Sequence, residues 1–287
     1  MTRKDIDEVS GVRTTGHEWD GIRELNNPLP RWWVWTFYAT IVWSIGYAIA
    51  YPAWPLISSA TTGVLGYSSR AEVKAELAAA EEAKSGYAAA VAGKTVADIL
   101  ADDGLRQFAT AAGAAAFRVN CIQCHGTGAA GSAGYPNLND DDWLWGGTPE
   151  QIEATIAHGI RFAGDPDTRV SEMPPFIDIL ERSRITEVSA FVASLSGTVE
   201  KPDLVEPGRQ IYADNCAACH GDAGKGNRDL GAPDLTDAIW HYGSSEAAIA
   251  AQVATPRHGM MPAWNARLGD VTVKELAVFV HSLGGGE

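Results

Sequence analysis

The chain contains little cysteine, little methionine and little positive charge. Four cysteines among 287 residues exclude a framework of many disulfides, which is how small secreted domains are often stabilised. Only 22 lysines and arginines stand against 36 acidic residues, for a formal net charge of −14. Binding to a nucleic-acid backbone depends on basic side chains that neutralise phosphates. The composition therefore excludes a nucleic-acid partner.

Ionisable residues are absent from one long stretch. Between Arg31 and Arg70 there is no Asp, Glu, Lys, Arg or His. Its most hydrophobic part, residues 32–57, is long enough as a helix to cross a hydrocarbon layer about 30 Å thick. We predict one transmembrane helix over 32–57. Its ends are marked by tryptophans, which favour the headgroup layer, and by prolines, which interrupt helices: Trp32, Trp33, Trp35, Trp54, Pro52 and Pro55.

A buried core helix and a cleaved signal peptide are the alternatives for this stretch. A signal peptide has a short apolar core close to a basic start, whereas a polar segment with several acidic residues comes first here. An uncleaved anchor fits better. Flanking charge barely orients it, because the twenty residues before the span carry three arginines and the twenty after it carry Arg70 and Lys74.

All four cysteines belong to two copies of the pattern Cys-x-x-Cys-His, at residues 121–125 and 216–220. Two thiols at this spacing can bond the two vinyl groups of one porphyrin, and the adjacent histidine then ligates the iron. Half of a zinc site or a pair of disulfides would leave the histidine in both copies as a coincidence. We therefore predict two covalent haems c, with thioether bonds and proximal ligands from Cys121, Cys124, Cys216, Cys219, His125 and His220.

Haem c attachment takes place on the periplasmic side of a bacterial membrane. Both motifs are therefore expected in the periplasm. The N-terminus is then expected in the cytoplasm, with the single span in the inner membrane.

The region that carries the motifs is an internal repeat. Residues 136–138, 143–146 and 173–176 of the first copy correspond to 233–235, 240–243 and 261–264 of the second. A helix is predicted to lead into each motif, and an apolar-periodic helix is predicted to close each copy. Each copy is therefore expected to be a small helical module around its own cofactor.

The predicted fold is mainly α, with one N-terminal transmembrane helix followed by two tandem class I cytochrome c-like domains. The Ala-rich connecting segment should form short helices or a disordered tether. The predicted boundaries are a tail over 1–31, the span over 32–57, the connecting segment over 58–103, and cytochrome domains over 104–199 and 200–287.

Methionine is the expected distal ligand, since His/Met ligation is typical of cytochromes c. Apart from Met1, the methionines are Met173, Met260 and Met261, all late in a repeat and close to a proline. We assign Met173 to the first haem iron. Met261 is assigned to the second because Pro262 follows it as Pro174 follows Met173, and Met260 is expected to pack against the ring. The rival ligands, which would make one site bis-histidine, are His158, His241 and His258.

Other residues are expected to surround the haems. The carbonyls of Pro136 and Pro233 either orient the proximal imidazoles or belong to ordinary turns. His241 replaces Leu144 of the first repeat, and it either tunes the potential with pH or faces solvent. The glycine-rich loop 221–226 is expected to reverse the chain rather than bind phosphate. The aromatics expected to pack on the porphyrins or reach the propionates are Trp143, Trp145, Trp240, Tyr242 and Trp264.

Three segments carry a resemblance to a known family: residues 20–33 at the entry to the span, residues 135–147 and residues 261–264. Together with the order of tail, span and two haem modules, they resemble the dihaem subunit III of cbb3-type cytochrome c oxidases, the CcoP or FixP subunit. The resemblance covers essentially the whole chain. It implies a non-catalytic subunit of the respiratory chain, with a catalytic haem-copper subunit and a monohaem cytochrome c subunit as partners. Electrons from a periplasmic cytochrome c would pass through it towards the reduction of O2 to water.

Two other functions stay open at this point. One is a free-standing membrane-bound dihaem carrier, and the other is a dihaem peroxidase-type enzyme. A peroxidase needs an exchangeable sixth iron position, and two well-placed methionines argue against it. The acidic composition either steers a basic cytochrome donor or serves solubility.

Overall fold

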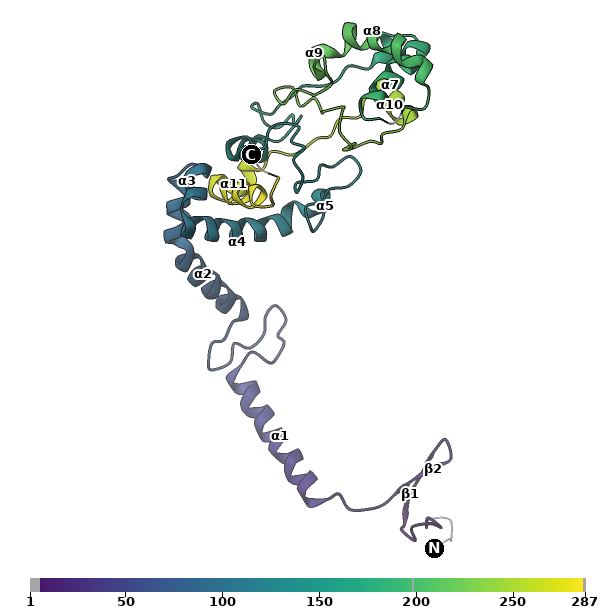
Figure 1. Cartoon of the computed structure of the whole chain (residues 1–287). Helices are drawn as coiled ribbons and strands as arrows, with labels where there is room; N and C mark the ends of the chain where they lie inside the picture. The colour runs from purple at the N-terminus through teal and green to yellow at the C-terminus, as the bar shows by residue number, and fades with distance from the viewer. Residues whose placement is uncertain (1–5, 198, 286–287) are drawn as a thin grey trace. The chain divides into compact units, whose positions relative to one another are not determined.

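The computed structural model describes residues 6–197 and 199–285. Residues 1–5 of the predicted tail and 286–287 of the predicted second domain lie outside them. The chain divides into two units, residues 1–82 and 83–287, which are described separately. The elements are labelled in Figure 1.

The N-terminal tail contains a β-hairpin that the sequence reasoning did not anticipate. Strands β1 (Thr14–Trp19) and β2 (Ile22–Leu25) pair antiparallel. Asp20 and Gly21 connect them with positive φ angles of 50° and 83°. Asp-Gly favours a two-residue hairpin turn of this kind. The dipeptide Asp20-Gly21 therefore indicates the hairpin in the sequence itself.

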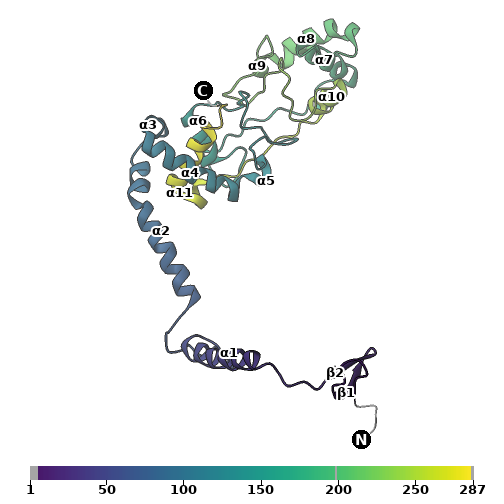
Figure 2. The ribbon, with the colours of Figure 1, turned by 60° about the horizontal axis from the view of Figure 1, so that its bottom comes forward.

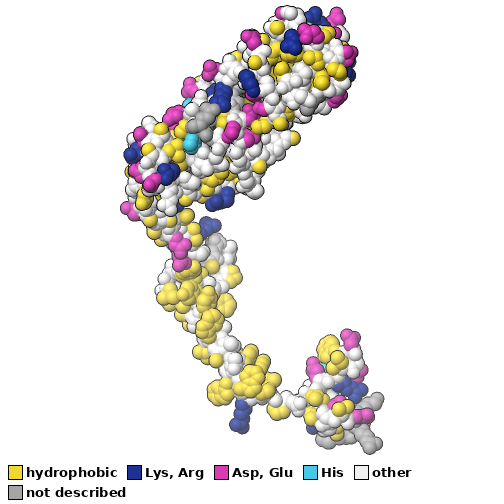
Figure 3. All heavy atoms as spheres, in the orientation of Figure 1, with side chains coloured by type: hydrophobic (Ala, Val, Ile, Leu, Met, Phe, Trp, Pro, Cys, Tyr) yellow, Lys and Arg dark blue, Asp and Glu magenta, His cyan; other side chains and the backbone are white. Residues whose placement is uncertain are grey.

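The predicted anchor is a helix, α1 (Arg31–Ala50), but it is shorter than the expected span of 32–57. It ends because Tyr51 precedes Pro52 and takes an extended conformation with φ −114°, since a proline disfavours helical geometry in the residue before it. Its 20 residues still correspond to about 30 Å. None of them is buried, and hydrophobic side chains dominate its surface in Figure 3. Length and composition make α1 a candidate membrane span.

The second unit is helical. The Ala-rich segment forms one long helix, α2, rather than several short ones, and it begins within the first unit. Helix α2 covers Ser69–Ala92. The helices after it are α3 (Val96–Ala101), α4 (Asp103–Asn120), α5 (Ile122–His125), α6 (Pro149–His158), η2 (Phe176–Asp178), α7 (Arg182–Leu195), η3 (Pro202–Leu204), α8 (Val205–Asn215), α9 (Ala217–His220), α10 (Glu246–Ala254) and α11 (Asn265–His281).

One hydrophobic core joins α3, α4, α6 and α11, and we call this group the first lobe. Gly113 of α4 lies so close to Glu275 and Phe279 of α11 that a Cβ there would overlap both. Trp143 donates its indole N–H to the carbonyl of Gly285. The C-terminal end of the chain is therefore packed within the first lobe, and Figures 1 and 2 both show α11 beside α4.

A separate core joins η2, α7, α8 and α10, and we call this group the second lobe. Gly208 of α8 meets Glu187 and Phe191 of α7 as closely as Gly113 meets α11. The helix that closes the first sequence repeat therefore packs on the helix that opens the second.

The division into domains 104–199 and 200–287 stays a prediction, but in this structure the closing helix of each repeat packs in the lobe of the other. The second lobe is contiguous, from Met173 to Ala254, whereas the first joins α3, α4 and α6 to residues after 260. The segment 159–173 leaves the first lobe and the segment 255–261 returns to it. They meet where Ile160 pairs antiparallel with Met261. The short link between α7 and α8 makes these two helices neighbours, which explains why they pack together.

Candidate haem-binding sites

Both Cys-x-x-Cys-His motifs adopt the same local structure. Each begins at the end of a long helix, where Cys121 caps α4 and Cys216 caps α8. A short helical turn follows and brings the histidine back over the first cysteine. The backbone N–H of His125 donates to Cys121 O at 3.0 Å, and that of His220 to Cys216 O at 2.9 Å. The two thiols of a motif and its histidine are thus held on one turn.

The four cysteines, all described, form no disulfide. Cys121 and Cys216 are half-buried, whereas Cys124 and Cys219 are exposed. Burial, with a smaller contribution from the neighbouring thiol, raises the pKa of Cys121 and of Cys216 to about 11. Among the described residues, the one group of three metal-ligating side chains contains no cysteine. The disulfide and zinc alternatives therefore find no support in this structure.

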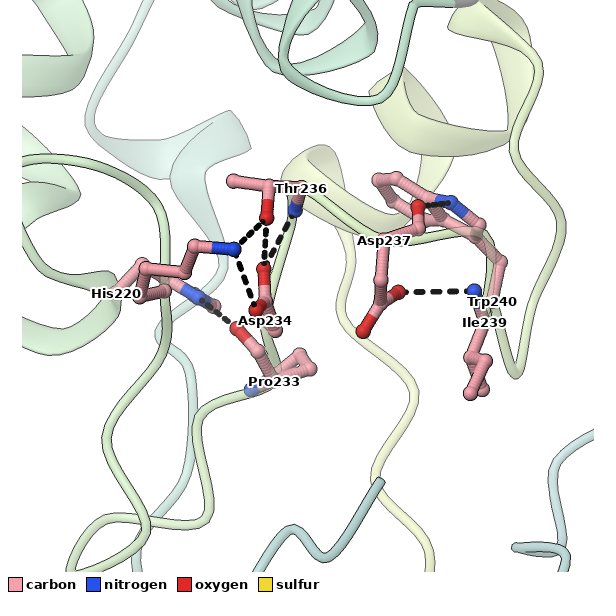
Figure 4. Close-up of polar contacts among 8 residues, drawn as sticks. His220, Pro233, Asp234, Thr236, Asp237, Ile239 and Trp240 are labelled. Carbon is pink, nitrogen blue, oxygen red and sulfur yellow. Dashed lines mark hydrogen bonds and ion pairs between the residues drawn. The ribbon is translucent and has the colours of Figure 1, made fainter. Parts of the chain in front are cut away.

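The proximal histidines are oriented by the predicted carbonyls. Nδ1 of His125 lies 3.2 Å from Pro136 O, and Nδ1 of His220 lies 3.2 Å from Pro233 O, the second of which Figure 4 shows. A hydrogen bond donated from Nδ1 leaves Nε2 available to ligate a metal. Burial lowers the pKa of both imidazoles, although the carbonyl acts in the opposite direction. The neutral form that binds iron is therefore favoured.

The distal methionines lie in the lobes opposite to those predicted. Met261 packs against the first-lobe core that includes Cys121 and Ile122. Met173 packs against the second-lobe core that includes Cys216 and Ala217. This packing favours Met261 with His125 and Met173 with His220 over the predicted pairs, because each methionine precedes a closing helix that packs in the lobe of the other repeat. Met260 is 61% exposed, and its packing against a ring stays a prediction.

The three rival histidines have different surroundings. Nδ1 of His158 lies 3.3 Å from both carboxylate oxygens of Asp165. His258 is exposed. Nε2 of His241 is buried without a hydrogen-bond partner, and burial lowers the pKa of this imidazole, with Asp140 and Asp237 opposing. Since His241 is half-buried, the solvent-facing alternative for it is not favoured.

The aromatic residues join the two lobes as well as filling them. Trp143 and Trp264 pack on the first core and Trp240 on the second. The ring of Trp145 fills the space that a side chain at Gly231 would need, and the ring of Tyr242 lies where a side chain at Gly134 would point. The contact is reciprocal, because each aromatic residue of one repeat meets the equivalent glycine of the other.

The sequence reasoning missed several features of the site. Helix α6 starts with a capping box between Thr148 and Gln151 and a proline at its first turn, which is a readable start signal. The loop 221–226 is the expected chain reversal, closed by Gly226 N–H donating to His220 O at 2.8 Å. Arg161 was not considered, although its guanidinium contacts both crossing segments.

The donor set fits haem c in each lobe. It comprises two thiols without a disulfide, a neutral imidazole oriented at Nδ1, and a thioether in the same core. Thiols for attachment and a His/Met pair for iron are the ligands of a cytochrome c. Charged groups of both signs are scattered over the visible face of this unit (Figure 3).

Comparisons with known proteins agree with these sites. Residues 11–58 match the N-terminal domain of cytochrome oxidase-cbb3, FixP. Residues 108–192 and 203–280 match cytochrome c oxidase, cbb3-type, subunit III. The cbb3-type cytochrome c oxidase subunit FixP of Sinorhizobium medicae is 64% identical over 284 residues, covering 99% of this chain and 98% of that protein.

More distant relatives match along nearly the whole chain too. The FixPc subunit of Rhizobium leguminosarum bv. viciae is 62% identical, with both chains fully covered. The CcoP subunit of Cereibacter sphaeroides is 54% identical, covering 96% of this chain and 95% of that protein. The chain belongs to the family of FixP/CcoP subunits, the subunit III of cbb3-type cytochrome c oxidases.

Proposed function

We propose that this chain is the dihaem electron relay of a cbb3-type oxidase. It would accept electrons from a periplasmic cytochrome c and pass them to the catalytic haem-copper subunit, which reduces O2 to water. The observation that carries the proposal is the same donor set in each of the two lobes. The cytochrome c domains imply haem c, and we propose two copies. Bound haem c would supply an iron that alternates between ferrous and ferric states.

The chain's own residues would hold and tune these haems. Cys121 and Cys124 attach one haem, and Cys216 and Cys219 the other. We assign His125 and Met261 to the iron of the first lobe, and His220 and Met173 to the iron of the second. The support is that each methionine shares a hydrophobic core with the corresponding cysteine. A thioether ligand raises the reduction potential of a haem, as an electron carrier in an oxidase needs.

The partners are other oxidase subunits, and we propose that they are the catalytic subunit and a monohaem cytochrome c subunit. Helix α1 would anchor the chain in the inner membrane, with the hairpin in the cytoplasm and the lobes in the periplasm. The chain itself would not reduce oxygen. The described residues contain a single candidate span, too few for the many-span histidine-rich bundle of a haem-copper centre.

Gentle detergent extraction, followed by identification of co-purifying chains, tests this function. The purified complex should oxidise a reduced cytochrome c with O2, and both haems of this chain should be reduced during turnover. Both haems should also be low-spin. Purification without oxidase subunits would indicate a free-standing carrier. A high-spin haem that reacts with peroxide would indicate a peroxidase instead.

A further inference from the structure

Arg161 belongs to the segment 159–173, which ends at Met173, and its side chain reaches the segment 255–261, which ends at Met261. Its Nε donates to the carbonyl of Ser171 at 2.9 Å, and its Nη1 donates to the carbonyl of Gly259 at 2.9 Å. Ser171 is two residues before Met173, and Gly259 is two residues before Met261. One guanidinium therefore contacts both methionine segments at equivalent places.

The backbone around Arg161 is built into the same crossing. Ile160 pairs with Arg169 on one side and with Met261 on the other. Arg161 N–H donates to Arg169 O at 2.7 Å, and Met261 N–H donates to Ile160 O at 3.0 Å. Arg161 itself has φ 53°, a left-handed conformation that a residue with a side chain adopts only when its surroundings impose it. The left-handed backbone at Arg161 therefore accompanies the pairing of Ile160 with Arg169 and Met261.

The charge of Arg161 has no acidic partner at ion-pair distance among the described residues. The guanidinium is half-buried and lies 5.8 Å from the ring centre of Trp145. Burial lowers the pKa of Arg161, which Glu172 and Tyr242 partly oppose from farther away. Its partners are the two carbonyls, and these are what its fixed fork of donors aligns.

We propose that Arg161 is a positioning residue for both distal methionines, clamping the two crossing segments so that Met173 and Met261 keep their irons ligated. The proposal rests on the proposed methionine ligation of the two haems. A charge-assisted hydrogen bond to each segment resists the movement that would take a thioether off its iron. Loss of the single side chain should therefore loosen both bonds together.

The test is the rate at which added imidazole displaces methionine, measured with the detergent-solubilised full chain carrying both haems. In Arg161→Gln we expect displacement at both ferric haems to be about tenfold faster, equivalent to about 1.4 kcal/mol. Both reduction potentials should fall, and both haems should lose part of the near-infrared methionine charge-transfer band. Arg161→Lys, which can reach a carbonyl with one donor but lacks the fork, should lie between Gln and the unaltered protein.

Arg169→Gln is the matched control. Its guanidinium lies over the same Trp145 ring, at 5.4 Å, but donates to Trp145 O and Thr155 Oγ1 and to neither methionine segment. It should leave both displacement rates unchanged. If Arg161→Gln accelerates one haem only, or neither, the shared clamp is wrong. If Arg161→Gln does not fold with both haems, unaltered rates in Arg161→Lys would overturn the clamp.

Met173→Ala and Met261→Ala separate this failure from failure of the proposed function. Each substitution should remove the methionine ligand of one haem, so that imidazole binds that iron without first displacing a thioether. If both substitutions do so while Arg161→Gln has no effect, methionine ligation is supported and the positioning role of Arg161 is wrong. If neither does so, the ligation itself is wrong.

Discussion

Gly113 and Gly208 stand at equivalent places, each eight residues before the first cysteine of its motif (113 and 121, 208 and 216), yet each meets the closing helix of the other repeat. Gly113 lies against Glu275 of α11, and Gly208 against Glu187 of α7. At both places the absence of a side chain lets two helix backbones approach. The two lobes therefore repeat one helix crossing with exchanged partners.

The first prediction concerns this crossing. Gly113→Ala should destabilise the first lobe by about 1–3 kcal/mol, because the new Cβ overlaps the α11 backbone. It should also weaken methionine ligation of the haem bound to Cys121, because α11 follows Met261 directly. Chemical denaturation and the charge-transfer band measure the two effects. Gly86→Ala is the control, since a Cβ at Gly86 meets nothing within 4 Å and alanine favours the helix.

The second prediction separates the exchanged ligand pairing from the pairing by sequence order. A variant with Cys121→Ala and Cys124→Ala should carry only the haem of the second lobe. Adding Met173→Ala to it should abolish the remaining methionine charge-transfer band and lower the remaining potential. Adding Met261→Ala should leave both readouts intact.

If Met261→Ala removes the band instead, the pairing by sequence order is supported, with Met173 at the haem of His125 and Met261 at the haem of His220. Met260→Ala serves as the control because this side chain is 61% exposed, and it should change neither the band nor the potential. If the form that carries only the second-lobe haem shows no methionine band before either substitution, histidine ligation by His241 becomes the better hypothesis.

The third prediction concerns the anchor. Removing residues 1–68 and fusing the rest to a secretion signal leaves α2 and both lobes intact. This form should be soluble, retain both haems and no longer assemble with the oxidase, since helix α1 and its entry sequence would be missing. Size-exclusion chromatography and pull-down of the catalytic subunit measure this. Full assembly of the truncated form would show that docking lies in the lobes.

The fourth prediction concerns pH. Burial, followed by the charges of Asp237, Asp140 and Asp234, raises the pKa of Asp142 from 3.8 to about 6. The folded state then holds its proton more tightly than the unfolded state, so this group lowers stability as pH rises from about 4 to 6. Asp142→Asn should remove that loss, stabilising the protein at pH 7 by about 1 kcal/mol after allowance for solvent screening.

Thermal unfolding of the solubilised protein at pH 4 and pH 7 measures this effect. Most of the gain from Asp142→Asn should disappear at pH 4, where the Asp142 carboxyl of the folded, unaltered protein is largely protonated and as uncharged as the amide that replaces it. The exposed neighbour Asp141 gives a matched control, and Asp141→Asn should show little change. An equal gain at both pH values would show that packing, rather than charge, is responsible.

The sequence predicted the features that local chemistry determines. The anchor, the helix into each motif and the closing helices follow from composition and periodicity. The Pro136 and Pro233 carbonyls were among the alternatives considered and are found at the proximal histidines. The span was predicted too long because Trp54 and Ile57 are apolar, although Pro52 ends the helix before them.

The exchange of closing helices was beyond local reasoning. Because the two repeats share one pattern, the apolar face of α7 suits α4 as well as α8, and that of α11 suits α8 as well as α4. Periodicity shows that a face will be buried, but not against which helix. The choice depends on the short link before α8 and on the crossing at Ile160 and Met261, which are tertiary features.

The contiguity of the second lobe sets an order in which the chain can fold during synthesis. In the proposed topology its elements, from Met173 to Ala254, cross the membrane in one run, so its core can close before the C-terminal segment follows. The first lobe contains the earlier motif but must wait for Met261 and α11, which pair with α4 across more than half of the unit. The cysteines made first are therefore the last to be enclosed, and the final twenty-odd residues of the chain complete the site around Cys121.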